Sequence, residues 1–306
     1  MRTVLLWMAR NRWLRERIPR LSFARRAVRR FMPGEDLASA IRAARELVDR
    51  GQGIILTRLG ENVTEPREAD AVAAHYHEVL DEGARSGLVP EISVKLTQLG
   101  LDIDRDACLR HALALAEHAE RIGSSFWIDM EDSSYVDATI SIYEEVLAAH
   151  PRTGICLQAY LRRSAGDVAR LLGKGASFRL VKGAYDEPRS IAFRTKPEVD
   201  GNFQALALTI GAAAATDRRV RLILGTHDSA LVERIADFAA TTGVERSVFE
   251  VAMLYGIRVR EAARLVAAGF RVRTLVAYGE YWYPWYMRRL AERPANVVFA
   301  LRQLLP

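Results

Sequence analysis

The chain has 306 residues, half of them hydrophobic, which is enough for one large core but long for an ordinary single domain. No apolar run approaches the roughly 18 residues of a membrane span, and the short apolar run near the start predicts neither a signal peptide nor a spanning helix. Its two cysteines, Cys108 and Cys156, lack disulfide or metal spacing, so we expect a cytoplasmic protein.

The net charge of +6 is concentrated at the start of the chain. Residues 1–30 hold ten arginines and one acid, so they carry +9 and the remaining residues carry −3. Although Pro19 must interrupt any single helix, apolar residues recur there at seven-residue spacing: Trp7, Leu14, Leu21 and Val28. Two interpretations stay open: an arginine-rich helical pair packed on the body of the protein, or a basic segment that touches anionic lipid on the inner face of the cell membrane. We expect no nucleic-acid partner, because no nucleic-acid-binding motif accompanies the arginines.

From residue 34 onward, helical and strand patterns alternate. Residues 34–51 predict a helix that is opened by Glu35 and Asp36 and closed by Gly51. Eight short apolar, β-branched runs follow, each ended by polar residues: 53–59, 91–99, 125–130, 153–160, 177–183, 220–227, 248–254 and 270–278. Alanine-rich amphipathic patterns separate them, and residues 281–292 supply the eighth helix. Eight such units in about 240 residues predict an α/β protein: a (β/α)8 barrel over residues 51–306, preceded by a basic helical arm over residues 1–50.

Polar residues at the ends of these runs are the candidate functional residues, because active sites of such barrels lie at the carboxyl ends of the strands. The ends supply cations, carboxylates, amides and hydroxyls: Arg58, Glu61, Lys95, Gln98, Asp129, Glu131, Gln158, Tyr160, Arg179, Lys182, Tyr185, Thr226, His227, Asp228, Glu250 and Tyr278. Any one of them is compatible with an ordinary rim residue. The cations together predict a site for an anionic ligand.

The run LVKGAY, residues 180–185, is the most specific of these ends. Strict alternation along a strand puts Arg179 and Lys182 on opposite faces, so one of them must lie beyond the regular strand, which Gly183 permits. A lysine followed by a glycine at a strand end can approach a phosphate closely. An alternative is a Schiff-base lyase in which Lys182 or Lys95 is the nucleophile. The chain has no Rossmann fingerprint and no metal-ligand spacing.

An aromatic and arginine-rich stretch, YGEYWYPWYMRRLAERPAN, occupies residues 278–296. If MRRLAE is helical, Arg288 and Arg289 lie about 100° apart around the helix axis, and Trp285 and Glu292 lie within one turn of them. One helical patch would then carry an aromatic ring, two guanidinium groups and a carboxylate.

Seven motifs resemble, in order, those of monofunctional bacterial proline dehydrogenase: SVKLTQLG, WIDMEDS, LQAYLRRS, RLVKGAY, THDS, FEVAMLYGIR and YGEYWYPWYMRRLAERPAN. The resemblance spans residues 34–304. It implies a distorted (β/α)8 TIM barrel that binds FAD, oxidises L-proline to Δ1-pyrroline-5-carboxylate and passes the electrons to a membrane quinone. The quinone favours a peripheral membrane contact through residues 1–30.

The resemblance also implies roles for individual residues. The substrate carboxylate would be bound by two planar guanidinium groups and one ammonium, those of Arg288, Arg289 and Lys95. Their counter-charges would be Glu292 and Glu61. The catalytic residues would be Asp129 and Arg179, and the pocket wall would include Tyr185, Leu254, Leu275 and Trp285. Contacts to FAD would come from Met130, Gln158, Arg179, Lys182, Gly183, Ala184, Thr226 and His227, and no metal is implied.

Departures from the family pattern gather around the substrate. The tyrosine and proline usual before the last Tyr-Gly are Leu275 and Ala277, a tyrosine before the arginine pair is Trp285, and the usual FEFQ is FEVA, with Val251 and Ala252. These changes remove two hydroxyls and one amide. Either they are neutral, or they admit a different cyclic amine such as a substituted proline. A hydroxylated ring would need a polar partner that leucine does not supply, so L-proline remains the first expectation.

Overall fold

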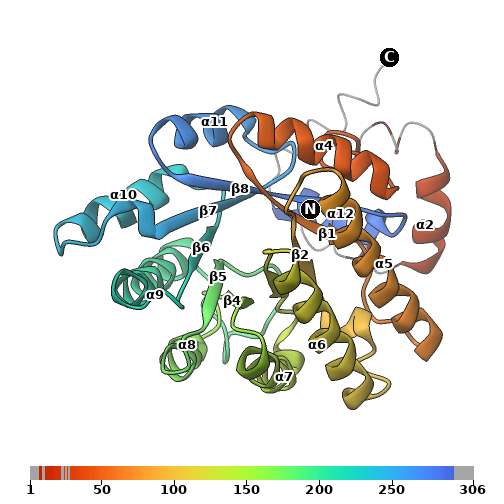
Figure 1. Ribbon diagram of the computed structural model, residues 1–306, viewed down its shortest axis with the longest axis horizontal. Coiled ribbons are helices and arrows are strands. Elements are labelled where there is room, and N and C mark those ends of the chain that lie inside the picture. Colours follow the sequence, from red (N-terminus) through yellow and green to blue (C-terminus); the bar gives the residue numbers. More distant parts are fainter. Residues whose placement is uncertain (1–6, 9–10, 22–23, 25, 27, 293–306) are drawn as a thin grey trace.

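A computed structural model gives the chain as a closed barrel of eight parallel strands (Figure 1). It describes residues 7–8, 11–21, 24, 26 and 28–292. The strands follow one another around the barrel in sequence order, and β8 pairs with β1 to close it. Their bounds are β1 (Gly53–Arg58), β2 (Glu91–Val94), β3 (Phe126–Ile128), β4 (Thr153–Gln158), β5 (Ser177–Val181), β6 (Leu222–Gly225), β7 (Phe249–Leu254) and β8 (Arg271–Tyr278). Each lies within a predicted apolar run, so the predicted fold class is confirmed.

Helices cover the outside of the barrel, as Figure 1 shows. Those that follow the strands are α5 (Pro66–Arg85), α6 (Arg105–Arg121), α7 (Val136–Ala149), α8 (Ser164–Leu172), α9 (Lys196–Thr216), α10 (Ser229–Ala240), α11 (Val259–Ala267) and α12 (Trp282–Glu292). Before the barrel, α4 (Leu37–Asp49) packs on β1 and β8. Asp36 caps α4 by accepting a hydrogen bond from the Ser39 amide at 2.7 Å, and Gly51 ends it with φ 75°, as the sequence predicted. Short 3₁₀ turns follow β2 and β3 and precede β7: η2 (Leu96–Leu99), η3 (Ser133–Tyr135) and η4 (Arg246–Val248).

Strand alternation divides the apolar side chains into two layers. The larger cluster fills the space between the strands and the helices, and Val251 belongs to it. A smaller cluster fills the inside of the barrel and includes Trp127, Ala252 and the partly buried Leu275. Gly154 makes room for the indole, because a Cβ there would lie 2.3 Å from the ring of Trp127. The barrel is therefore packed at mid-height, and any ligand site must lie above or below this layer.

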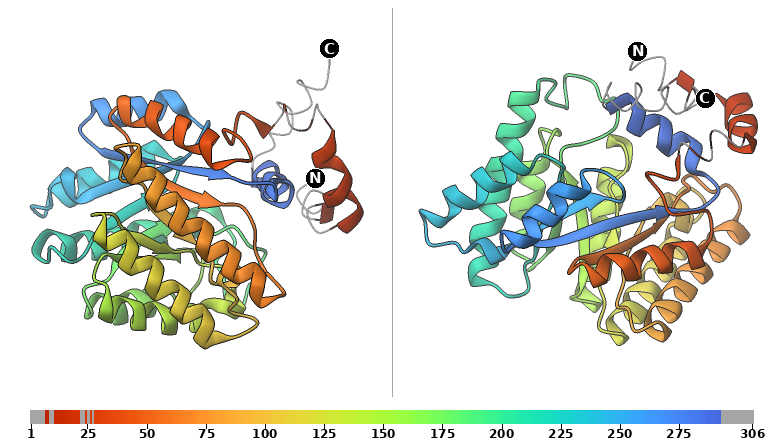
Figure 2. Two further views of the ribbon diagram at one scale, coloured as in Figure 1. Left: turned by 45° about the vertical axis from the view of Figure 1, so that its right-hand side comes forward. Right: turned by 90° about the horizontal axis from the view of Figure 1, so that it is seen from above.

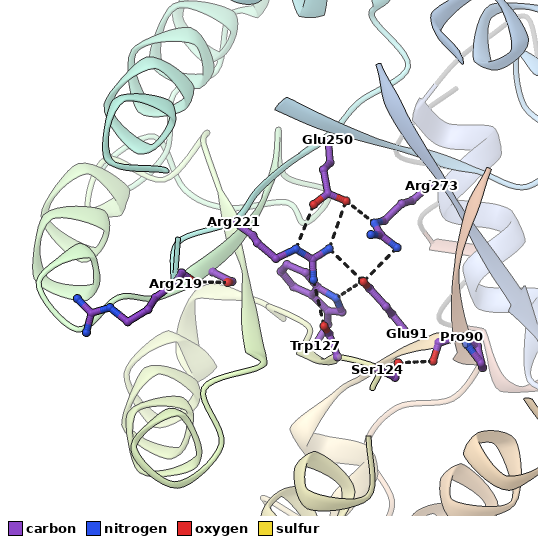
Figure 3. A network of polar contacts seen from close by, with 10 residues as sticks. Pro90, Glu91, Ser124, Trp127, Arg219, Arg221, Glu250 and Arg273 are labelled. Carbon is purple, nitrogen blue, oxygen red and sulfur yellow. Dashed lines mark hydrogen bonds and ion pairs between the residues drawn. The ribbon is translucent and has the colours of Figure 1, made fainter. Parts of the chain in front are cut away.

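Four charged side chains close the amino-terminal end of the barrel, and we call them the floor network: Glu91, Arg221, Glu250 and Arg273 (Figure 3). Arg221 lies 3.0 Å from each of the two glutamates, and Arg273 lies 3.0 Å from Glu91. Trp127 donates its indole hydrogen to Glu91 at 2.6 Å. The two positive and two negative charges cancel, so burial leaves no net charge at the floor.

The floor network corrects one expectation. Glu250 was predicted at the carboxyl end of its strand, but it is the second residue of β7 and lies at the amino-terminal end. Tyr278 does end β8, as expected, but its hydroxyl lies 2.8 Å from His75 on α5, so its side chain faces the helix layer rather than the mouth. The apolar runs alone did not show that Glu250 lies near the start of β7 or that the side chain of Tyr278 points outward.

The described part of the basic arm is broken at the predicted proline. It contains α2 (Arg12–Arg17) and η1 (Ile18–Arg20), which includes Pro19. Midway along the arm, buried side chains join one apolar cluster with α12: Ala24, Val28, Phe31 and Met32. Figure 2 shows α12 between the barrel and α2. This part of the arm therefore packs on the body, whereas Trp7 and Trp13 are 61% and 58% exposed.

A close backbone approach fixes the packed end of the arm. A Cβ on Gly256, in the loop after β7, would lie 1.5 Å from the carbonyl oxygen of Arg30, and Gly256 has φ 71°.

The seven-residue apolar spacing of the arm does not form one face, since Val28 is buried but Trp7 and Leu21 are exposed. The boundary at residue 50 stays a prediction. None of the helices in the described residues combines the length and hydropathy that a membrane crossing needs.

Candidate active site

Most of the predicted site residues lie at the carboxyl ends of the strands, on one mouth of the barrel. Residues that end a strand are Gln158 and Leu254, and those that directly follow one are Lys95, Asp129, Met130, Lys182, Gly183, Ala184, Thr226 and His227. Arg179 and Leu275 lie within β5 and β8. β5 ends at Val181, so Lys182 lies beyond the strand, as alternation required.

An ion pair between the partly buried Asp129 and the buried Arg179 lies at this mouth. Ser93 on β2 joins it: its hydroxyl donates to Oδ1 of Asp129 at 2.6 Å and accepts from Nη2 of Arg179 at 3.0 Å. Burial opposes ionisation of Asp129, but the adjacent guanidinium lowers its pKa below the ordinary value. The carboxylate is therefore ionised at neutral pH.

Two buried polar atoms beside this pair lack partners. Nη1 of Arg179 and Oε1 of Gln158 have no hydrogen-bond partner among the described residues. They come from neighbouring strands, since Gln158 pairs with Val181 two residues beyond Arg179. An unsatisfied buried donor or acceptor costs about 1–3 kcal/mol. A ligand that offers both an acceptor and a donor at this position would satisfy them.

Lys182 lies in a network of alternating charges on the rim. Its ammonium donates to Asp200 on α9 at 2.6 Å and to Asp228, the N-cap of α10, at 3.3 Å. Lys196 pairs with the same two carboxylates. Lys182 is therefore held in ion pairs with two carboxylates of the rim.

Lys95 stands at the start of η2, directly after β2. Its ammonium donates to the carbonyl oxygen of Gly60 at 3.4 Å, in the loop after β1 that also carries Glu61. Glu131, after β3, accepts hydrogen bonds from the amide and hydroxyl of Thr97. Burial raises the pKa of Glu131 to about 7, and Lys95 opposes this rise.

The inner wall beside the mouth is apolar at two of the positions that were expected to line the pocket. Ala252 and Leu275 belong to the cluster inside the barrel, but Val251 faces the helix layer and cannot line the pocket. Leu254 ends β7 next to His227, whose Nε2 lies 3.5 Å from the Leu254 amide.

The aromatic and arginine-rich stretch is helical as expected, in α12. Its apolar cluster includes Leu59 after β1 and Ala277 near the end of β8, so the helix lies at the carboxyl-terminal end of the barrel. Trp285 is partly buried against this cluster, and Arg289 is partly buried. The side chains of Arg288 and Glu292 lie outside those described, so their predicted roles stay predictions.

Sequence reasoning missed the residues that hold these side chains in place. Ser93, Thr97 and Asp200 contact Asp129, Glu131 and Lys182 respectively. Ser93 had a visible signal, because a small hydroxyl interrupts an apolar strand two residues before Lys95. Asp200 lay inside a helical pattern and gave none. No group of three or more histidine, cysteine or acidic side chains in the described part of the chain could hold a metal ion.

Comparison with known proteins gives a consistent result. The family model described as proline dehydrogenase matches residues 40–302. Proline dehydrogenase 1 of Bacillus subtilis subsp. natto is 33% identical over 100% of this chain and 99% of its own length. The proline dehydrogenase of Deinococcus radiodurans is 33% identical over 90% of this chain and 89% of its own.

Similar solved structures support the same fold. The crystal structure of proline utilization A (PutA) from Bdellovibrio bacteriovorus, inactivated by N-propargylglycine, matches with a TM-score of 0.80 at 21% identity. The match covers 88% of this chain but 33% of that one, so this chain spans about a third of PutA. A PutA variant from Bradyrhizobium japonicum gives a TM-score of 0.75 over 88% of this chain and 31% of that one, at 21% identity. Because the family model and full-length relatives at 33% identity agree with the barrel, the chain belongs to the proline dehydrogenase family.

Proposed function

We propose that the protein is an FAD-dependent dehydrogenase that oxidises L-proline to Δ1-pyrroline-5-carboxylate and passes the electrons to a membrane quinone. The observation that carries this proposal is the pair of unpartnered polar atoms at the mouth, Nη1 of Arg179 and Oε1 of Gln158. A guanidinium donor beside an amide acceptor fits the polar edge of an isoalloxazine ring, which presents acceptors next to an N–H donor. The family to which the chain belongs supports the same assignment.

The residues around these atoms fit the remainder of the cofactor. Lys182 would bind the diphosphate through its ammonium on the rim, and Thr226 and His227 lie at the neighbouring strand end. Met130, Gly183 and Ala184 complete the proposed contacts. When bound, FAD would accept the hydride that leaves the substrate.

The remaining groups would bind and orient the substrate. Lys95, Arg288 and Arg289 would bind its carboxylate, and Glu61 and Glu292 would offset their repulsion. Holding the carboxylate at one end fixes the ring carbon next to nitrogen relative to Asp129 and Arg179, so orientation supplies much of the rate. Tyr185 and Trp285 would cover the ring.

The apolar inner wall supports unsubstituted L-proline as the substrate. Ala252 and Leu275 offer no hydrogen bond, and a hydroxylated ring would leave its hydroxyl unsatisfied against them. Lys182 is held by two carboxylates, which argues against the Schiff-base lyase.

The test is spectroscopic and has three outcomes. The purified protein should be yellow, and the colour should bleach on anaerobic addition of L-proline. If the protein is yellow but does not bleach, the proposed cofactor stands and the proposed substrate is wrong. If the protein is colourless, the proposed cofactor is wrong. Arg289→Met should then weaken binding of carboxylate ligands, whereas Arg264→Met, on the outer helix α11, should not. Equal affinities of the Arg289→Met variant and the wild type would contradict the proposed carboxylate site.

A peripheral membrane contact is part of the same proposal. Residues 1–30 carry +9, and two tryptophans within them, Trp7 and Trp13, are exposed. Such a surface suits anionic lipid headgroups. The protein should sediment with vesicles that contain anionic lipid, less so at high salt, and not with neutral vesicles. Equal sedimentation with both kinds of vesicle, or none with either, would refute the contact.

A further inference from the structure

Thr97 connects three strand ends of the barrel mouth. It is fully buried in η2, two residues after Lys95. Its amide and hydroxyl donate to Oε1 and Oε2 of Glu131 at 3.2 and 2.7 Å. Its hydroxyl oxygen accepts from the amide of Asn62 at 3.2 Å, and its carbonyl oxygen accepts from the amide of Val63 at 3.3 Å. One residue therefore joins the segments that follow β1, β2 and β3.

The segment after β1 depends on this connection. Asn62 adopts φ 54°, a left-handed conformation that costs free energy for any residue with a Cβ. The hydrogen bonds to Thr97 offset this cost and so fix Glu61, the residue before Asn62. Lys95 touches the same segment through the carbonyl oxygen of Gly60. The positions of Lys95 and Glu61 are thus set together.

Glu131 is the hydrogen-bond acceptor for Thr97 on the segment after β3. It is 4% exposed, and both of its carboxylate oxygens accept hydrogen bonds from Thr97. Gln158 at the end of β4 holds its backbone, since Nε2 donates to the Glu131 carbonyl oxygen at 3.2 Å. A buried carboxyl group without hydrogen bonds costs free energy. The two hydrogen bonds from Thr97 therefore stabilise Glu131 in this position.

We propose that Thr97 and Glu131 are positioning residues, which hold Lys95 and Glu61 at a fixed separation across the pocket mouth and so set the affinity for the substrate carboxylate. This inference rests on the proposed function, in which Lys95 binds that carboxylate. Thr97 and Glu131 act through Lys95 and Glu61 rather than on the reacting atoms. Their loss therefore weakens binding of the substrate more than it slows oxidation of the bound substrate.

The test removes one hydroxyl. Thr97→Val keeps the side-chain volume and deletes the two hydrogen bonds of the hydroxyl, one to Oε2 of Glu131 and one from the amide of Asn62. The matched control is Thr139→Val on α7, which is 1% exposed and whose hydroxyl has no hydrogen-bond partner in the described part of the chain. For Thr97→Val we expect KM for L-proline to rise roughly three- to tenfold with kcat within about twofold of wild type. The control should change neither.

A binding measurement supplies a readout that a general loss of stability does not move. A proline analogue with a ring oxygen in place of the nitrogen cannot be oxidised to an imine, so its binding is to be followed through the flavin absorbance. Its dissociation constant should rise for Thr97→Val by the same factor as KM, at unchanged flavin content. A folded Thr97→Val protein that binds the analogue with wild-type affinity overturns the proposal.

A second pair of variants isolates the hydroxyl if valine prevents folding. Thr97→Ser and Thr97→Ala differ in that group alone, so the serine variant should bind the analogue roughly three- to tenfold more tightly. Equal affinities of the two variants would refute the positioning role. Failure of the wild type to oxidise L-proline refutes the proposed function instead, so the two failures are distinguishable.

Discussion

The titration of Glu131 gives a quantitative test of the barrel mouth. Burial raises the pKa of this carboxyl from 4.5 to about 7, against the opposing effect of Lys95. Between these two values the folded protein holds a proton that the unfolded chain has released. The contribution of the carboxyl to the free energy of unfolding is therefore complete below pH 4.5 and is lost as the pH rises through about 7. A difference of about 2.5 in pKa corresponds to about 3 kcal/mol.

Glu131→Gln removes this titration. We expect the unfolding free energy of the variant, minus that of the wild type, to become more positive by about 2–3 kcal/mol between pH 5 and pH 8. Urea unfolding of both proteins at several pH values measures it, and the subtraction cancels groups that titrate in both. Glu117→Gln, at an exposed position of α6, is the control for the substitution itself. A difference that does not change with pH would refute the burial of this carboxylate.

Three further substitutions test other parts of the barrel. Glu250→Gln should lower the free energy of unfolding by about 3–5 kcal/mol, because the carboxylate of Glu250 is buried and its two partly buried arginine partners lose part of their counter-charge. Urea unfolding measures this, and a loss below about 1 kcal/mol would contradict it. Gly183→Ala should lower the flavin content of the purified protein, because a Cβ would lie 2.2 Å from the ring of Tyr160 at φ 115°. Wild-type flavin absorbance would count against that. Gly256→Ala should release the arm and speed tryptic cleavage after Arg30, since a Cβ there meets the Arg30 carbonyl oxygen. An unchanged digestion pattern would show that the contact is dispensable.

The sequence predicted the barrel because its signal repeats. Every one of the eight strands lies inside a predicted apolar run, and parallel strands buried on both sides need such runs. The same runs conceal where within a strand a charge stands. Glu250 comes after a single apolar residue of β7, and that start cannot be located from apolar residues alone. Its assignment to the mouth failed for this reason.

The sequence predicted those site residues that are charged and that directly follow a strand. Lys95, Asp129 and Lys182 each directly follow a strand, so the topology of the barrel alone brings them to one mouth. Arg179 was named correctly but lies inside β5, and its partner Ser93 is 86 residues away in the chain. Alternation places both side chains inside the barrel, but it does not show that their hydrogen bonds meet.

Thr97 illustrates the remaining difficulty. In the sequence, a threonine between leucine and glutamine at a strand end is interchangeable with valine, because both are β-branched and of similar volume. What distinguishes them is a carboxylate 34 residues later that is buried against the hydroxyl. Removing that hydroxyl leaves a buried carboxyl group with one oxygen unsatisfied, a cost in free energy that the apolar pattern of the sequence does not show. The role of a buried hydroxyl next to a strand-end carboxyl group, such as that of Thr97, is therefore visible in the structure but not in the sequence.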